Sequence, residues 1–95
     1  MTYRLSDMSA QDMLDIYVTG VREFGTARAE KYYSGLVRMF DFLSENPRAA
    51  RERPEFAPPV RIHPFGSHVV IYTLEDRGVF IVRVLGGRQD WARYL

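Results

Sequence analysis

The first half of the chain carries two stretches in which apolar residues recur every three or four positions, the spacing of a helix with one apolar face. The first stretch places on one face Met13, Leu14, Tyr17, Val21 and Phe24. Ser9 is suited to cap its start and Gly25 to end it in a left-handed conformation. We therefore expect a helix over residues 10–24.

A second stripe follows at once and consists of Ala29, Tyr33, Leu36, Phe40 and Leu43. Thr26 can cap its start, and Asn46-Pro47 ends it because the residue before a proline avoids helical geometry. Only Gly25 and Thr26 separate the two stripes, so the two helices are expected to form an antiparallel hairpin. Another element must cover the apolar face of that hairpin.

The second half changes its period and becomes rich in Val, Ile and aromatic residues. Three such runs cover residues 60–65, 68–74 and 79–85, with turns at Gly66-Ser67 and at residues 75–78. They predict a three-stranded antiparallel meander whose last strand lies in the sheet interior. Residues 2–5 predict a short strand, residues 48–59 an irregular connector, and the C-terminal tail a short helix. The expected fold class is α+β: short N-terminal strand, α-helical hairpin, meander and short tail, with the helices on one sheet face.

Composition narrows the class of protein without identifying it. The chain has 95 residues, 46% of them hydrophobic, which is suited to a single domain over residues 1–95. A net charge of +1 gives no expectation of sequence-specific nucleic-acid binding. No cysteine occurs, and the two histidines have no spacing typical of a metal site, so we expect neither metal nor cofactor. The N-terminus shows no signal peptide or membrane span, and we expect a cytoplasmic protein.

Four stretches in order along the chain resemble the ParE/RelE toxin superfamily, and specifically its ParE branch. They are residues 9–17 with Phe24-Gly25 and Ala29-Glu30, residues 42–48 ending in Asn-Pro-Arg, residues 64–72, and residues 81–90. No single stretch is specific, but the ordered set covers almost the whole chain. The resemblance implies a RelE/ParE-like fold. One departure is that family members commonly carry histidine after the last strand, where this chain has Gly86-Gly87.

The resemblance also implies a function. A ParE-like chain would be the toxin of a type II toxin–antitoxin module, binding and inhibiting DNA gyrase without catalysing a reaction. A ParD-like antitoxin would neutralise it in a hetero-oligomer. The alternative is a RelE-type, ribosome-dependent mRNA endoribonuclease, which needs a general base, a general acid and cations aimed at a phosphate. Its candidates are Arg61, His63, His68, Arg83, Arg88 and Tyr94.

Two sets of residues are candidates for contacts with partners. Strand alternation places Arg61 and His63 on one face, and it places Arg83 on the sheet face away from the helices. A basic sheet face together with the tail gives the expected target-binding set: Arg61, Arg83, Arg88, Gln89, Asp90 and Trp91. Aromatic residues that spread around both helices give the antitoxin-binding set: Tyr17, Tyr32, Tyr33 and Phe40. Each set has a plainer reading, as solvated cross-strand charges, half-buried tyrosines, and a Trp91 that covers the core.

Overall fold

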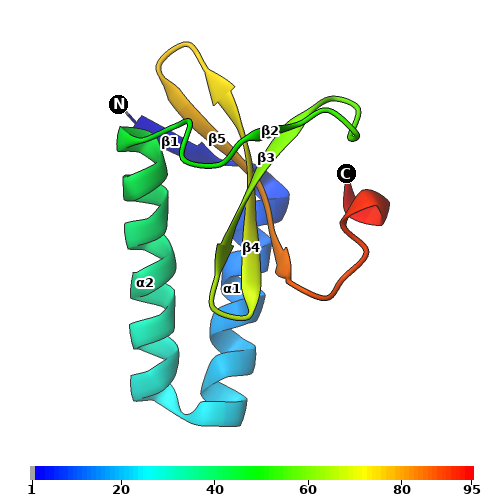
Figure 1. Ribbon diagram of the computed structural model, residues 1–95. Helices are drawn as coiled ribbons and strands as arrows, with labels where there is room; N and C mark the ends of the chain where they lie inside the picture. The colour runs from blue at the N-terminus through cyan, green and yellow to red at the C-terminus, as the bar shows by residue number, and fades with distance from the viewer. Residues whose placement is uncertain (1) are drawn as a thin grey trace.

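The computed structural model of the protein describes residues 2–95. Its elements are, in chain order, β1 (Thr2–Leu5), α1 (Asp7–Phe24), α2 (Thr26–Glu45), β2 (Glu52–Arg53), β3 (Val60–Phe65), β4 (His68–Glu75), β5 (Gly78–Gly86) and the 3₁₀ helix η1 (Trp91–Tyr94). Figure 1 shows α1 and α2 side by side as an antiparallel hairpin, with η1 apart from both. The α+β class, the helical hairpin and the short terminal helix are confirmed.

The two helix starts differ from the sequence prediction. Helix α1 begins at Asp7, one turn early, because Ser6 is extended and its hydroxyl accepts the Ser9 N–H at 2.9 Å. Ser9 lies inside the helix, fully buried, and its own hydroxyl donates to the Ser6 carbonyl. Thr26 is the first residue of α2 rather than its cap. Gly25 joins the helices with a φ of +86°, a backbone conformation that residues other than glycine rarely adopt.

The sheet has five strands in the order β1-β5-β4-β3-β2. The predicted meander forms its centre, and β5 is an interior strand between β4 and β1, as expected. The sequence prediction missed that β1 pairs with β5 in parallel and that the connector contributes the two-residue β2 beside β3. Gly78 allows the first pairing, because a Cβ there would lie 1.8 Å from the Thr2 carbonyl oxygen.

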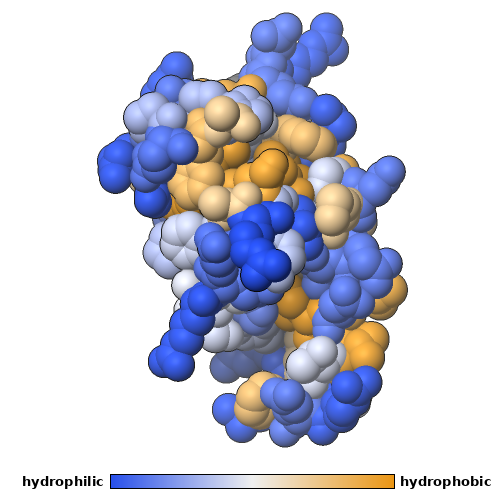
Figure 2. Space-filling view, turned by 90° about the vertical axis from the view of Figure 1, so that its right-hand side faces the viewer, coloured by the Kyte–Doolittle hydropathy of each residue, from blue (hydrophilic) through white to orange (hydrophobic). Residues whose placement is uncertain are grey.

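Both faces of the sheet are apolar. The helices cover one face. The hydrophobic cluster between the helices and this face is formed by Met13, Leu36, Phe40, Leu43, Ala50, Val70, Tyr72, Val79, Ile81 and Val84. A smaller cluster on the other face contains Val60, Val69, Ile71 and Leu85, with Trp91 packed against it. The C-terminal tail therefore covers the face that the helices leave open. Figure 2, turned toward the side where the tail lies in Figure 1, shows a group of apolar residues rimmed by hydrophilic ones.

A β-bulge interrupts the pairing of β4 with β5. Tyr72 pairs with Ile81 and Ile71 with Arg83, so Val82 is an extra residue on β5. The bulge shifts the alternation, and beyond it Val84 rather than Arg83 faces the helices. Arg83 pairs with Ile71, which belongs to the smaller cluster on the face away from the helices (the tail-side cluster), so Arg83 lies on the side that the sequence predicted.

No helix within residues 2–95 is long and apolar enough to cross a membrane.

Candidate partner-binding site

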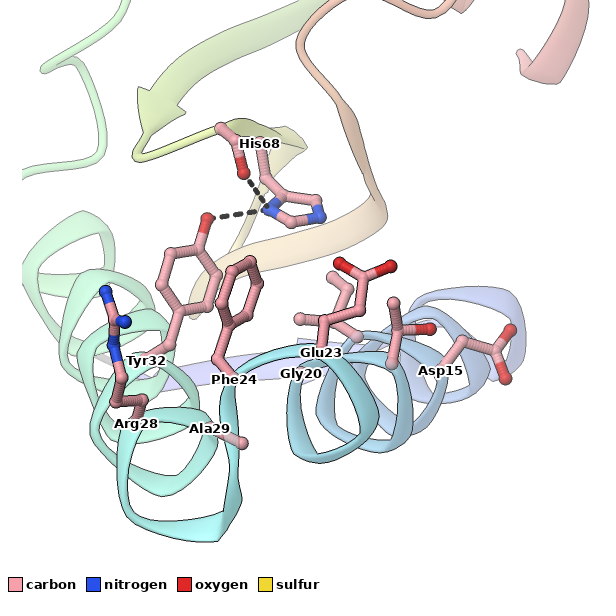
Figure 3. A pocket seen from close by; sticks show the side chains of 11 residues that line it. Asp15, Gly20, Glu23, Phe24, Arg28, Ala29, Tyr32 and His68 are labelled. Atoms are coloured by element: carbon pink, nitrogen blue, oxygen red, sulfur yellow. Dashed lines mark hydrogen bonds between the residues drawn. The ribbon is translucent and has the colours of Figure 1, made fainter.

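Tyr32 of α2 links the helical hairpin to the turn between β3 and β4. Its hydroxyl lies 2.6 Å from His68 Nδ1 and 3.2 Å from the Phe65 carbonyl oxygen. Gly66 has a φ of +55°, and a Cβ at this position would lie 2.7 Å from the Tyr32 hydroxyl. A glycine at this turn therefore serves both the backbone conformation and the close approach of the tyrosine. Figure 3 shows the Tyr32 ring directed at the strand start that carries His68.

A first hollow lies between α1, α2 and this turn. It measures about 530 Å³, and its lining includes Ile16, Gly20, Phe24, Ala29, Tyr32 and His68. The helices touch at its floor, where a Cβ on Gly20 would lie 3.2 Å from the Ala29 Cβ. Two small residues thus create a depression between larger apolar side chains (Figure 3). Glu23 and Asp15 contribute carboxylates on the α1 side, and Arg28 adds a guanidinium on the α2 side.

A second hollow lies on α2 beside β3, and Tyr32 and Arg28 line it as well as the first. It measures about 660 Å³, with apolar walls formed by Gly35, Met39, Phe42 and Phe65. Its charged lining residues are all basic: Arg28, Lys31 and Arg38. Helical geometry explains this, because these three positions fall within an arc of about 80° on α2. The two hollows share Arg28 and Tyr32 in their linings, and we call the pair of hollows the Tyr32 groove.

The residues predicted to bind an antitoxin are not all at this groove. Tyr32 is part of it, whereas Tyr17 and Tyr33 pack edge to face with ring centroids 5.9 Å apart across α1 and α2. Phe40 is only 1% exposed and packs against Tyr3 of β1. Its assignment to a binding surface is wrong, because the turn of α2 directs it into the core between helix and sheet. Lys31, Arg38 and Met39, which line the second hollow, were missed, and helical spacing places only Met39 on the same side of α2 as Tyr32.

The predicted basic patch on one sheet face does not form. Arg61 and His63 share a face, as expected, but it is the helix side: Arg61 pairs with Tyr72, and His63 contacts Phe42 of α2. The Arg61 guanidinium donates to the Ala50 carbonyl at 2.6 Å. Arg83 lies on the opposite side of the sheet, so the two arginines cannot act as one patch.

Arg83 is also neutralised within the fold. Its Nε and Nη2 each donate to an Asp12 carboxylate oxygen at 2.8 Å, and the residue is 9% exposed. The hydrogen bonds that Arg83 donates to Asp12 raise the pKa of its guanidinium, which therefore stays charged and paired. Asp12 escaped the sequence analysis because nothing local links two residues 71 positions apart.

The tail divides into anchoring and exposed residues. Gln89 accepts the Gly86 N–H through its side-chain oxygen at 2.6 Å, and the Trp91 indole N–H donates to the Gly86 carbonyl. Trp91 packs against the smaller hydrophobic cluster, in agreement with the alternative interpretation that it covers the core. Arg88 and Asp90 are exposed and available for contact with another molecule.

His68 is held in a partly buried site. Burial lowers the pKa of its imidazole, and the negative charge of Asp12 offsets this only in part. The Tyr32 hydroxyl and His68 Nδ1 share a hydrogen bond of 2.6 Å, which stabilises the link between α2 and the β3–β4 turn. Within residues 2–95, no group of three or more His, Asp or Glu side chains is arranged to hold a metal ion.

Comparison with known proteins identifies the family. No curated protein matches the sequence significantly. Among solved structures, one titled "Chromosomal ParDE TA system from P. aeruginosa" is similar, with 20% sequence identity and a TM-score of 0.76. The match covers 90% of this chain and 95% of that one, and it supports the fold described above. Residues 3–91 match the family model described as the ParE toxin of the type II toxin–antitoxin system parDE. The chain therefore belongs to the ParE toxin family of type II toxin–antitoxin systems.

Proposed function

We propose that this ParE-family toxin acts in the cytoplasm by binding DNA gyrase and inhibiting it, without catalysing a reaction itself. A ParD-like antitoxin neutralises it by forming a hetero-oligomer with it. The observation that carries the proposal is the family match over residues 3–91, which extends from β1 to the first residue of η1.

The contacts of the candidate catalytic residues favour binding over RNA cleavage. Arg83 is committed to Asp12, Arg61 donates to the Ala50 carbonyl, and His68 is bonded to Tyr32. These groups lie on different faces of the sheet and have partners within the fold. A ribonuclease needs its acid, base and phosphate-binding cations to converge on one reacting phosphate.

The target surface of the proposal is accordingly smaller than the sequence suggested. Arg61, Arg83, Gln89 and Trp91 make side-chain hydrogen bonds within the fold, and the exposed Arg88 and Asp90 are the members that the proposal keeps for contact with the target. Together with the exposed Arg93 of η1, they give the tail a charged outer side.

The test is expression of the chain from a tightly controlled promoter without antitoxin. Plasmid supercoiling and mRNA integrity are measured before growth stops. We expect loss of negative supercoiling or DNA breaks while mRNA stays intact. Cleaved mRNA with normal DNA topology would instead establish the RelE-type activity, and undisturbed growth would indicate a fold that has lost its toxicity.

The same assay tests the tail. Replacing Arg88 and Asp90 together with alanine is expected to reduce gyrase inhibition at unchanged stability. The matched control replaces Arg48 and Glu45, an exposed pair of the same charges at the end of α2, and should retain full toxicity. Equal toxicity of both double variants would remove the tail from the target surface.

A further inference from the structure

Helix α1 carries a second apolar stripe, on the side away from its buried residues. Leu14 and Val18 lie one turn apart and are 54% and 45% exposed. Helical geometry places the pair about 140° around α1 from the buried Ser9 and Met13. Within residues 2–95, neither side chain belongs to a hydrophobic cluster or lines the Tyr32 groove. The fold therefore leaves both side chains open to solvent.

Polar residues extend this stripe toward both ends of the helix. Asp7 and Gln11 precede Leu14, and Arg22 follows Val18, at successive spacings of three or four residues. All five side chains are exposed, and they fall within an arc of about 80° over about 22 Å of helix. We call these five residues the α1 ridge. Such spacing is typical of the seam between two packed helices.

The charges of the α1 ridge complement those of a second ridge that runs in the opposite direction. Asp7 and Arg22 are equally far from a point halfway between residues 14 and 15. A twofold axis at that point places Asp7 of each copy opposite Arg22 of the other. It also brings the two Leu14 side chains together and places Val18 opposite Gln11. Within residues 2–95, neither Asp7 nor Arg22 belongs to an ion pair, so both charges are available.

The other charges near the ridge favour this arrangement over a parallel one. A parallel copy would place Asp7 beside Asp7 and Arg22 beside Arg22, which opposes association. The net charge of +1 is too small to keep two copies apart. One like-charge approach remains, because Asp15 lies near the axis at the flank of the ridge. Its exposed carboxylate accepts a hydrogen bond from Gln11 at 2.8 Å, and solvent screens the repulsion.

We propose that the α1 ridge is a self-association surface, through which two copies of this chain form an antiparallel α1–α1 dimer. No ridge residue lines the Tyr32 groove, so both grooves stay open in the dimer. A contact between two single helices buries less than the roughly 800 Å² per partner of a standard interface. The dimer is therefore expected to be weak and to form in the micromolar range. The inference does not depend on the proposed function.

Analytical ultracentrifugation of the full chain, purified without any partner, tests the apolar centre of the ridge. We expect a monomer–dimer equilibrium in the wild type. Leu14→Glu should raise the dimer Kd at least tenfold, because it buries a carboxylate against its own copy. The matched control is Phe24→Glu, since Phe24 is 58% exposed on the same helix but lies outside the ridge. It should leave Kd within twofold, and circular dichroism confirms that both variants are folded.

A charge exchange tests the antiparallel register. Asp7→Arg and Arg22→Asp should each weaken the dimer several-fold, because each replaces two attractive contacts by two repulsive ones. Together they should restore it. Each substitution also places an unfavourable charge at its end of α1, so nonspecific damage to the helix would add up in the double variant. Asp15→Asn should strengthen the dimer, because it removes the like charges near the axis.

The remaining outcomes overturn the inference. A wild type that stays monomeric throughout the micromolar range would exclude self-association, and a dimer that Leu14→Glu leaves unchanged would form through another surface. A monomeric wild type whose gyrase inhibition or antitoxin binding is lost in folded Leu14→Glu would assign the ridge to that partner instead. Since the dimer is measured without gyrase or antitoxin, its absence leaves the proposed function untouched.

Discussion

Asp12 and Arg83 form a bidentate ion pair that joins the start of α1 to the edge of β5, with both nitrogen–oxygen distances at 2.8 Å. The side chains are only 12% and 11% exposed, and Asp12 also accepts the Val84 backbone N–H at 2.9 Å. One carboxylate thus neutralises a nearly buried cation and occupies a free strand edge just after the bulge at Val82. It fixes the position of the hairpin on the sheet.

Breaking this pair should destabilise the protein strongly. Asp12→Ala leaves Arg83 and the Val84 N–H without partners, and we expect a loss of about 3 kcal/mol in the free energy of unfolding, measured by urea denaturation. The double variant Asp12→Ala, Arg83→Met should recover part of the loss because no charge stays unpaired. Arg4→Ala, which breaks the exposed pair with Glu75, is the control and should shift the urea midpoint far less. A single variant as stable as this control would mean that the pair contributes nothing.

Tyr72 attaches the connector to the core. Its fully buried hydroxyl donates to the Pro47 carbonyl at 2.9 Å and accepts the Ala50 N–H at 3.3 Å. Tyr72→Phe keeps the ring but leaves two backbone groups unsatisfied, so we expect a loss of about 2 kcal/mol in urea denaturation. Tyr94→Phe removes an exposed hydroxyl and should be nearly neutral. Equal effects of the two substitutions would contradict the role of the hydroxyl.

The sequence was sufficient where structure depends on local patterns. The apolar stripes predicted both helices, and the Val- and Ile-rich runs predicted β3, β4 and β5 to within one residue at each end. It was insufficient where distant residues meet. The parallel pairing of β1 depends on Gly78 approaching Thr2, and the neutralisation of Arg83 depends on Asp12. A basic sheet face was therefore expected where the folded chain has an internal ion pair.

The same distinction applies to the candidate site. Tyr32 was identified because aromatic residues exceed what one helix face can bury. Phe40 was assigned with it because both belong to the broad apolar surface of α2, and the sequence cannot show which part the sheet covers. The groove itself depends on Gly20 and Ala29 at the helix contact and on Gly66 under Tyr32. Small residues give no periodic signal of a depression.

His68 makes stability depend on pH in a defined direction. Burial lowers its folded pKa below about 6.5, the value expected in the unfolded chain, so protonation favours unfolding. The contribution of neutral His68 to the free energy of unfolding is complete above about pH 6.5. It decreases as the pH falls from that value to the folded pKa, and below the folded pKa it changes no further. The charged groups near His68 are unchanged in the variant described below; they are Asp12, Asp15, Glu23 and Arg28.

The measurement compares the free energy of unfolding at pH 8 and at pH 5 in the wild type and in His68→Gln. The variant should lose less stability between the two values because its side chain does not titrate. His63→Gln removes the other histidine, which has no bond to Tyr32, and serves as the reference. An identical pH dependence in wild type and His68→Gln would show that the partly buried site of His68 does not favour its neutral form.

Trp91 should determine whether the tail stays on the sheet. Its ring packs on the tail-side cluster and its N–H donates to the Gly86 carbonyl at 3.2 Å. Since the ring is only partly buried, Trp91→Ala should lower the free energy of unfolding by about 2 kcal/mol, and Trp91→Phe should retain most of the packing.

Trypsin cleavage after Arg88, followed by mass spectrometry, reports directly on whether the tail is bound to the sheet. Cleavage should accelerate in Trp91→Ala and stay near the wild-type rate in the exposed-site control Asp76→Ala, because a bound tail cannot enter the protease cleft. If the wild type were cleaved after Arg88 as fast as Trp91→Ala, the tail would not be anchored by its tryptophan, and Arg88 and Asp90 would have no fixed position from which to contact a target.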